Sequence, residues 1–333
     1  MKNRIVSFLI IAIVTIIVLF FSLKDDYNTI VDTILNINKF WFLFSFILLF
    51  IYYILKAICI LQIAKEFNQK YSFKDAIRLV IETNFFHAVT PFSTGGQPYE
   101  IYSLSKKDIK IADAMSISIG NFITYQIALV FLGLVSIIFN YTFNIIDSGF
   151  LNSLITLGFL INFFVIVILL FFSISKNTDK TIVDFIIEFL YKIKIVKDAD
   201  LLKDKFHNYL KDFNSGSKLL FKNKKKFLIL VLTQLISLIS LYLVPLSLFI
   251  GVGINYINIQ QDIVTMSYTM LVGSFVPIPG GTGGLEYGFI KFFGKFIKNS
   301  KVNAIMLLWR FITYYFGMIF GAIVLNIKKE RLK

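Results

Sequence analysis

Two stretches decide the fold of this chain: Val89-Thr-Pro-Phe-Ser-Thr-Gly-Gly-Gln-Pro-Tyr-Glu100 and Val276-Pro-Ile-Pro-Gly-Gly-Thr-Gly-Gly-Leu-Glu286. Each one interrupts an apolar segment with prolines and paired glycines, and each ends in a carboxylate. Proline removes a backbone donor, and glycine relaxes the helix. Irregular backbone persists at membrane depth only where protein buries it or where it lines a watery cavity. Two such interruptions, one in each half, indicate a transport site.

The composition places the chain in a membrane. Of its 333 residues, 57% are hydrophobic and only 16% are charged, whereas soluble domains carry about 25% charged residues. The net charge of +14 comes from lysines that lie mainly in loops between apolar segments, which the positive-inside bias explains better than nucleic-acid binding does. We therefore expect a multi-pass protein of the cell membrane that contacts bilayer phospholipids and binds no nucleic acid directly.

Six apolar segments are long enough to cross the hydrocarbon core, which takes about 20 residues of helix. They cover residues 5–23, 41–63, 114–139, 151–174, 227–250 and 302–327. The first segment follows Lys2 and Arg4, and no Ala-x-Ala cleavage pattern comes after it. We therefore expect a retained helix there rather than a signal peptide.

Two further apolar segments, residues 76–90 and 263–276, stop at the interruptions. At about 15 residues each, they reach the midplane but cross it only with difficulty. The predicted fold class is all-α: one integral membrane domain, residues 1–333, with about six full spans plus two broken re-entrant helical hairpins in inverted arrangement. The interruptions also align loosely as an internal repeat, with Pro91, Gly95-Gly96 and Glu100 set against Pro277, Gly280-Gly281 and Glu286.

Lysine positions predict the orientation. Lys2 and Arg4 place the N-terminus in the cytoplasm, and the lysine-rich loops after the second span and after the first interruption lie on the same side. The first hairpin therefore enters from the cytoplasm, whereas the second follows residues 251–262, which lack Lys and Arg, and enters from outside. Both termini are expected in the cytoplasm. Residues 175–226 are predicted to form a cytoplasmic, lysine-rich insertion of amphipathic helices.

Ionisable side chains at membrane depth are costly and usually face a partner or a cavity. Six occur here: Lys56, Glu82, His87, Glu100, Glu286 and Arg310. Their depths predict two ion pairs, Lys56 with Glu82 on the inner side and Glu286 with Arg310 near mid-depth. Such pairs either line a headgroup pathway or simply hold helices together, and the sequence leaves both interpretations open.

The glycine pairs suggest how a headgroup would be held. A half-helix N-terminus presents free N–H groups and a partial positive charge, which suit a lipid phosphate. Gly283-Gly284 directly precedes such a start, and Gly95-Gly96 precedes Gln97-Pro98; alternatively, the glycines only let helices approach closely. We predict a headgroup pathway lined by Glu82, Gly95, Gly96, Gln97, Glu100, Gly280, Gly281, Gly283, Gly284, Glu286, Arg310 and Tyr314.

No signature of metal or cofactor chemistry occurs in the sequence. Cys59 is the only cysteine, and the two histidines, His87 and His207, lie far apart in sequence. A nucleotide-binding glycine loop, an HExxH motif and a serine nucleophile elbow are all missing. We expect no metal and no cofactor, and the sequence identifies no catalytic residue.

At the two interruptions and in Leu308-Trp-Arg-Phe-Ile-Thr-Tyr-Tyr315, the sequence resembles the transmembrane region of the lysylphosphatidylglycerol synthase family, which includes the multiple peptide resistance factors. The resemblance implies a membrane domain that passes lysylphosphatidylglycerol to the outer leaflet and so gives resistance to cationic antibiotic peptides. In full-length members, a fused cytoplasmic domain transfers lysine from lysyl-tRNA to phosphatidylglycerol. We expect this chain to lack that domain.

Three hypotheses follow. The first is a flippase-like protein that handles an anionic or aminoacylated phospholipid, such as lysylphosphatidylglycerol. The second is a phosphatidylglycerol lysyltransferase or its membrane subunit. The third is a membrane scaffold whose lysine-rich segment recruits a lipid-modifying synthase or a glycosyltransferase. These hypotheses allow two protein partners: a separate cytoplasmic aminoacyl-lipid synthase and a second copy of the chain.

Overall fold

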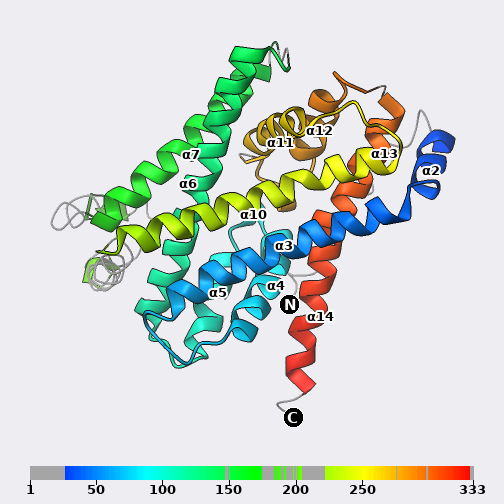
Figure 1. Cartoon of the computed structure of the whole chain (residues 1–333). Helices are drawn as coiled ribbons and strands as arrows, with labels where there is room; N and C mark the ends of the chain where they lie inside the picture. Colours follow the sequence, from blue (N-terminus) through cyan, green and yellow to red (C-terminus); the bar gives the residue numbers. More distant parts are fainter. Residues whose placement is uncertain are drawn as a thin grey trace.

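A computed structural model describes residues 27–146, 149, 151–174, 222–274, 276–297 and 299–330, and scattered positions from 184 to 204 (Figure 1). In this part of the chain every regular element is a helix, which confirms the all-α class. The predicted span 5–23 and most of the predicted insertion 175–226 lie outside the described residues.

The described helices include two short 3-10 turns, η1 and η2, and one π-helical segment, η3. In chain order the elements are α2 (Tyr27–Leu35), α3 (Lys39–Ala64), α4 (Phe73–Val89), η1 (Pro91–Ser93), α5 (Gly96–Ser105), α6 (Ile111–Phe143), α7 (Leu151–Ile174), α10 (Lys224–Gly251), α11 (Ile259–Gly273), η2 (Pro279–Gly281), α12 (Gly284–Phe293), α13 (Asn299–Arg310), η3 (Phe311–Phe316) and α14 (Gly317–Glu330).

Five helical segments of the described part are long and apolar enough to cross a membrane. They are Lys39–Ala64, Ile111–Phe143, Leu151–Phe171, Lys224–Gly251 and Ser300–Ile327. They coincide with five of the six predicted spans. The last of them runs without a break through α13, η3 and α14, where a continuous span was predicted. The chain is therefore a multi-pass helical membrane protein.

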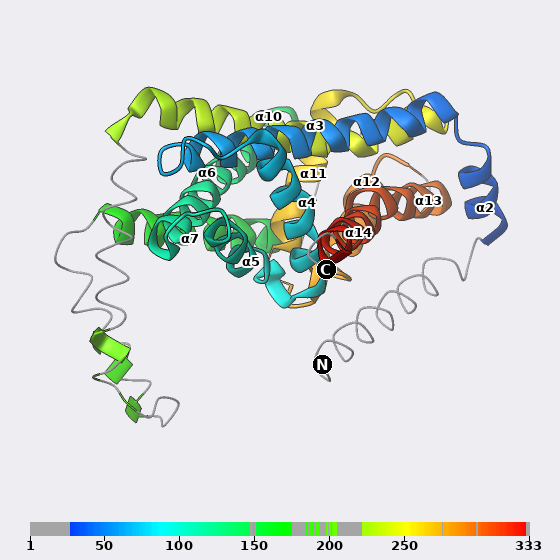
Figure 2. The ribbon, with the colours of Figure 1, turned by 90° about the horizontal axis from the view of Figure 1, so that it is seen from below.

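Helices α3 and α10 lie side by side and antiparallel, and they form the long axis of the bundle (Figures 1 and 2). The amide of Asn38, just before α3, donates to the Gly251 carbonyl at 2.8 Å. At the opposite end, Lys226 Nζ donates to the Gln62 carbonyl at 2.8 Å. These contacts define two ends of the molecule, which we name the Gly251 end and the Ala64 end.

The first broken hairpin starts and returns at the Ala64 end. Helix α4 begins at Phe73 because the side chains of Ser72 and Asp75 cap each other's backbone amides. After η1, α5 leads back, and Asn68 Nδ2 donates to the Lys107 carbonyl at 2.9 Å across the mouth of the hairpin. Both arms of this hairpin therefore lie at one end of the bundle.

The second broken hairpin starts at the Gly251 end. Only a short loop separates the end of α10 from α11, and a reciprocal cap between Asn258 and Gln261 starts that helix. After η2, α12 leads back towards the start of α13, which packs against α2 and α10. The two hairpins therefore enter from opposite ends, as predicted. Which end faces the cytoplasm stays a prediction.

Candidate functional site

The tips of the two hairpins meet inside the bundle. Turn η1 contacts η2, and α4 also contacts η2. The hydroxyl of Tyr314, which belongs to the π-helical segment η3, donates to the Ala88 carbonyl at the end of α4 at 3.0 Å. Single π-helical turns occur frequently at functional sites. Three elements that are far apart in sequence therefore converge at one point.

Both tips use the same backbone turn. Each begins with a proline, Pro91 or Pro279, and continues with two residues of positive φ. In η1 these residues are Phe92 (51°) and Ser93 (55°), whereas in η2 they are Gly280 (66°) and Gly281 (61°). The structural repeat therefore matches Pro91 with Pro279 and not with Pro277. The predicted alignment was wrong, and Glu100 and Glu286 are not equivalent positions.

The predicted ion pair between Glu286 and Arg310 is confirmed. Arg310 Nε lies 2.7 Å from Glu286 Oε1, and both side chains are 5% exposed. Another nitrogen of the guanidinium, Nη2, donates to the Gly280 carbonyl at 3.1 Å and to Thr282 Oγ1 at 3.2 Å. The group also lies 4.3 Å from the centre of the Tyr314 ring. Arg310 therefore holds the η2 tip in place.

The N-terminus of α12 is capped by a carboxylate of the chain itself. Glu286 Oε2 accepts a hydrogen bond from the Gly283 amide at 2.6 Å. At the other tip, the Gly95 amide donates to Thr90 Oγ1 at 2.8 Å, and Gly96 packs directly against the His87 ring. The Gly283 and Gly95 amides are therefore not free for a lipid phosphate.

The predicted pair of Lys56 with Glu82 is wrong. Glu82 Oε1 lies 2.7 Å from Arg78 Nε, one turn earlier on the same helix, and Oε2 accepts from the Tyr99 hydroxyl at 2.6 Å. The predicted arm, residues 76–90, already contains Arg78, but the prediction paired Glu82 by depth alone. The i, i+4 spacing of Arg78 and Glu82 places both side chains on one face of α4, where they meet.

Lys56 lies instead among aromatic rings. Its Nζ donates to the Tyr52 hydroxyl at 3.3 Å and lies 5.3 Å and 5.1 Å from the ring centres of Tyr52 and Tyr125. It also interacts electrostatically with Glu100, whose carboxylate accepts from Ser118 Oγ on α6 at 2.6 Å. The predicted site residues thus form separate clusters, and Glu100 belongs to a different one from Glu286.

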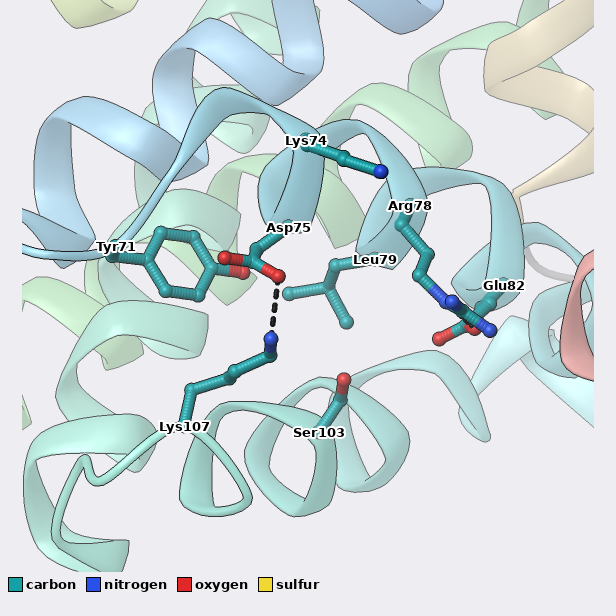
Figure 3. Close-up of a pocket in the computed structure, with 8 residues that line it drawn as sticks. All are labelled: Tyr71, Lys74, Asp75, Arg78, Leu79, Glu82, Ser103 and Lys107. Atoms are coloured by element: carbon teal, nitrogen blue, oxygen red, sulfur yellow. Dashed lines mark hydrogen bonds and ion pairs between the residues drawn. The ribbon is translucent and has the colours of Figure 1, made fainter. Parts of the chain in front are cut away.

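A cavity of about 300 Å³ opens between α4 and α5 near the Ala64 end (Figure 3). Its lining is largely charged, and Glu82 is the one member that the sequence analysis assigned to the pathway. The lining residues are Tyr71, Lys74, Asp75, Arg78, Leu79, Glu82, Ser103 and Lys107. The other charged members carried a signal in the sequence, a dense group of charges beside an apolar arm, and that signal predicted only the orientation.

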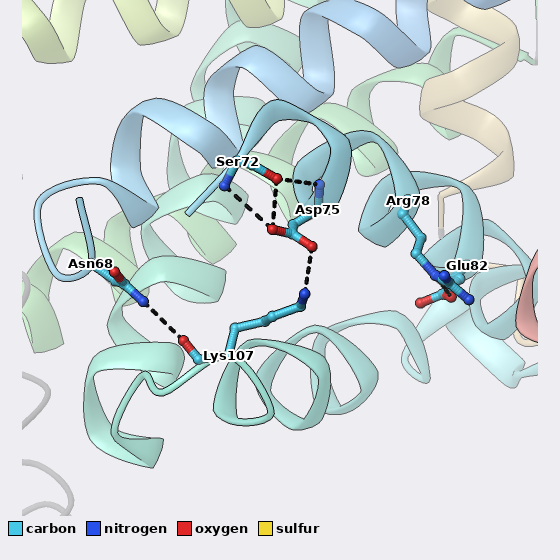
Figure 4. A network of polar contacts seen from close by, with 6 residues as sticks. All are labelled: Asn68, Ser72, Asp75, Arg78, Glu82 and Lys107. Carbon is cyan, nitrogen blue, oxygen red and sulfur yellow. Dashed lines mark hydrogen bonds and ion pairs between the residues drawn. The ribbon is translucent and has the colours of Figure 1, made fainter. Parts of the chain in front are cut away.

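Two ion pairs organise this cavity (Figure 4). Lys107 Nζ lies 2.6 Å from Asp75 Oδ1, and this pair links α4 to the turn after α5. Partial burial opposes the charge on Asp75, but the hydrogen bonds from Lys107 and Ser72 outweigh that effect and lower the pKa of this carboxyl. On the floor, Glu82 is 2% exposed and pairs with Arg78, whose Nη2 also donates to the Val324 carbonyl at 3.0 Å.

Comparisons with known proteins agree with this architecture. A family profile described as "Lysylphosphatidylglycerol synthase TM region" matches residues 5–321. A "UPF0104 membrane protein" of Archaeoglobus fulgidus is 24% identical over 294 residues, which cover 85% of this chain and 84% of that protein. The "Uncharacterized protein MG306 homolog" of Mycoplasma pneumoniae is 22% identical over 331 residues, which cover 93% and 83%. The profile match includes both hairpins and η3.

Proposed function

Because this chain belongs to the lysylphosphatidylglycerol synthase transmembrane-region family, we propose that it moves an anionic or aminoacylated phospholipid headgroup between the two leaflets of the cell membrane. The observation that supports this proposal most directly is that two hairpins, which enter from opposite ends, meet beside the buried pair of Glu286 and Arg310. Discontinuous helices that meet within a bundle commonly form the substrate site of a transporter.

The chemistry of Arg310 supports this proposal. A guanidinium matches a phosphate as well as it matches a carboxylate, so a headgroup phosphate competes with Glu286 for Arg310. When the phosphate takes that place, Glu286 keeps its hydrogen bond to the Gly283 amide, and the N-terminus of α12 still compensates its charge. The exchange therefore leaves neither side chain as an isolated buried ion, which would be costly in a membrane.

A test uses the purified protein in liposomes that contain fluorescent phosphatidylglycerol and an external quencher. We expect wild-type protein to expose inner-leaflet label faster than empty liposomes do. Arg310→Lys keeps the charge but loses the planar guanidinium, which contacts Glu286, Gly280 and Thr282. We expect transport about tenfold slower, which corresponds to about 1.4 kcal/mol of barrier.

The matched control is Ser136→Ala. It removes a buried hydrogen bond of 2.8 Å between α6 and Ser267 on α11 and leaves the tips intact, so transport should stay near the wild-type rate. Gel filtration checks that each variant is folded. Wild-type protein that moves no label would overturn the proposal, as would a folded Arg310→Lys variant with an unchanged rate.

A further inference from the structure

The cavity at the Ala64 end has a composition that the tip of the hairpins does not share. Lys74, Arg78 and Lys107 bring three cations to the lining of a space of about 300 Å³, and the hydroxyl-bearing residues Tyr71 and Ser103 also line it. We propose that this cavity binds the phosphate group of a phospholipid headgroup or of a free phosphate compound. For the lipid, it is the docking site that precedes the movement proposed above, and that part rests on the proposed function.

Lys74 supplies a cation that is ready to bind. Its side chain is exposed and points along the cavity in Figure 3. Among the described residues it has no carboxylate partner within ion-pair distance, in contrast to Arg78 and Lys107. The ammonium group of such a lysine acts as a point charge. It binds the oxygens of a phosphate that carries one or two negative charges.

The ion pair between Lys107 and the carboxylate of Asp75 can open. Asp75 uses Oδ1 for Lys107, whereas its Oδ2 accepts from Ser72 Oγ at 2.7 Å and from the Ser72 amide at 3.4 Å. The cap of α4 therefore survives when the ion pair opens. Side chains that are 45% and 23% exposed form a pair of low net stability, so a phosphate can replace Asp75 as the partner of Lys107.

The floor of the cavity sets the depth of binding. Glu82 is 2% exposed and is fixed by both Arg78 and the Tyr99 hydroxyl. Its carboxylate repels an anion, so the phosphate stays at the mouth between Lys74 and Lys107. Arg78 remains engaged with Glu82 and the Val324 carbonyl. The binding pair is therefore Lys74 and Lys107, and Asp75 is the competing anion inside the protein.

The test measures binding by the full-length protein in nanodiscs. The soluble probes are inorganic phosphate and glycerol 1-phosphate. For the lipid, nanodiscs of phosphatidylglycerol are compared with nanodiscs of phosphatidylcholine. We expect Lys74→Gln and Lys107→Gln to weaken binding about fivefold each, on the scale of an exposed ion pair. Asp75→Asn should strengthen binding, because it removes the competing charge. This opposite sign would not result from simple damage to the fold.

Lys106→Gln is the matched control. Lys106 neighbours Lys107 in sequence, and the substitution changes the net charge by the same amount, but its Nζ lies over the Tyr102 ring at 5.4 Å and it does not line the cavity. We expect its binding to equal that of the wild type. Equal weakening by Lys106→Gln and Lys107→Gln would show nonspecific attraction and overturn the inference.

The probes also separate the two phosphate sources and the two proposals. Binding of both soluble phosphates indicates a free-phosphate site, whereas binding only in phosphatidylglycerol nanodiscs indicates the lipid. No binding of any probe overturns the inference. Arg310→Lys should keep cavity binding while transport falls. Cavity binding in a wild-type protein that transports no lipid would refute the proposed function and leave the phosphate site standing.

Discussion

Two buried carboxyl groups of the second hairpin, those of Glu286 and Asp262, have very different surroundings. Glu286 is 4% exposed and shares its two oxygens between Arg310 and the Gly283 amide. Asp262, on α11, is fully buried, and neither of its oxygens has a hydrogen-bond partner among the described residues. An ionised carboxylate without a partner is costly to bury. Position in the sequence alone does not distinguish these two cases.

We therefore predict that Asp262→Asn leaves the melting temperature of the purified protein unchanged or raises it. The neutral amide has nearly the same shape and removes the cost of burying a charge. In contrast, Glu286→Gln should lower stability by about 3–5 kcal/mol, because it leaves Arg310 as an uncompensated buried cation. Thermal unfolding in detergent measures both. A large loss in Asp262→Asn would contradict the assignment of Asp262 as unpartnered.

At the scale of elements, the informative unit is the hairpin tip. Turns η1 and η2 each place two residues of positive φ after a proline, but η1 uses Phe92 and Ser93 there and η2 uses two glycines. The difference has a steric cause. A Cβ atom at Gly280 would lie 2.1 Å from the Tyr314 ring, which sits beside η2 because the π-helical segment places it there. Glycine spacing therefore misled the sequence alignment of the two hairpins.

Comparing two glycine substitutions tests this packing. Gly280 and Gly253 both have positive φ, 66° and 81°, but nothing lies within 4 Å of a Cβ atom at Gly253. Gly253→Ala should cost only the backbone term of about 1–2 kcal/mol. Gly280→Ala should cost more, because the ring also has to move. Measured in a Tyr314→Ala background, the extra cost of Gly280→Ala should disappear; its persistence would rule out the clash.

For the whole molecule, the antiparallel pair of α3 and α10 defines the ends at which the two hairpins enter (Figures 1 and 2). The charged cavity lies near the Ala64 end. Under the predicted orientation this end faces the cytoplasm, so the cavity meets headgroups of the inner leaflet. The tip contact lies deeper, between the hairpins, and helix α4 reaches both sites, with Arg78 and Glu82 at the cavity and Ala88 at the tips.

Single cysteines test this orientation. Cys59 is fully buried, and Cys59→Ser provides a background without thiols. In that background, Tyr256→Cys, in the loop between α10 and α11, should react with an impermeant maleimide on intact cells. Gln69→Cys, in the loop between α3 and α4, should react only after lysis. Both positions are exposed. Labelling of both, or of Gln69→Cys alone, in intact cells would refute the predicted sidedness.

The sequence by itself determined the all-α membrane class, the five described spans and the two interrupted hairpins that enter from opposite ends. These features follow from hydropathy, segment length and proline positions, which are local properties of the chain. The pair of Glu286 and Arg310 was also predictable, since few charges share that depth. The pairing of Glu82 with Arg78 follows from their i, i+4 spacing on one helix, whereas only the tertiary structure decided how the tips align and that Lys74 and Lys107 flank one cavity. Those outcomes depend on how each helix is placed and rotated against its neighbours, which no local pattern in the sequence records.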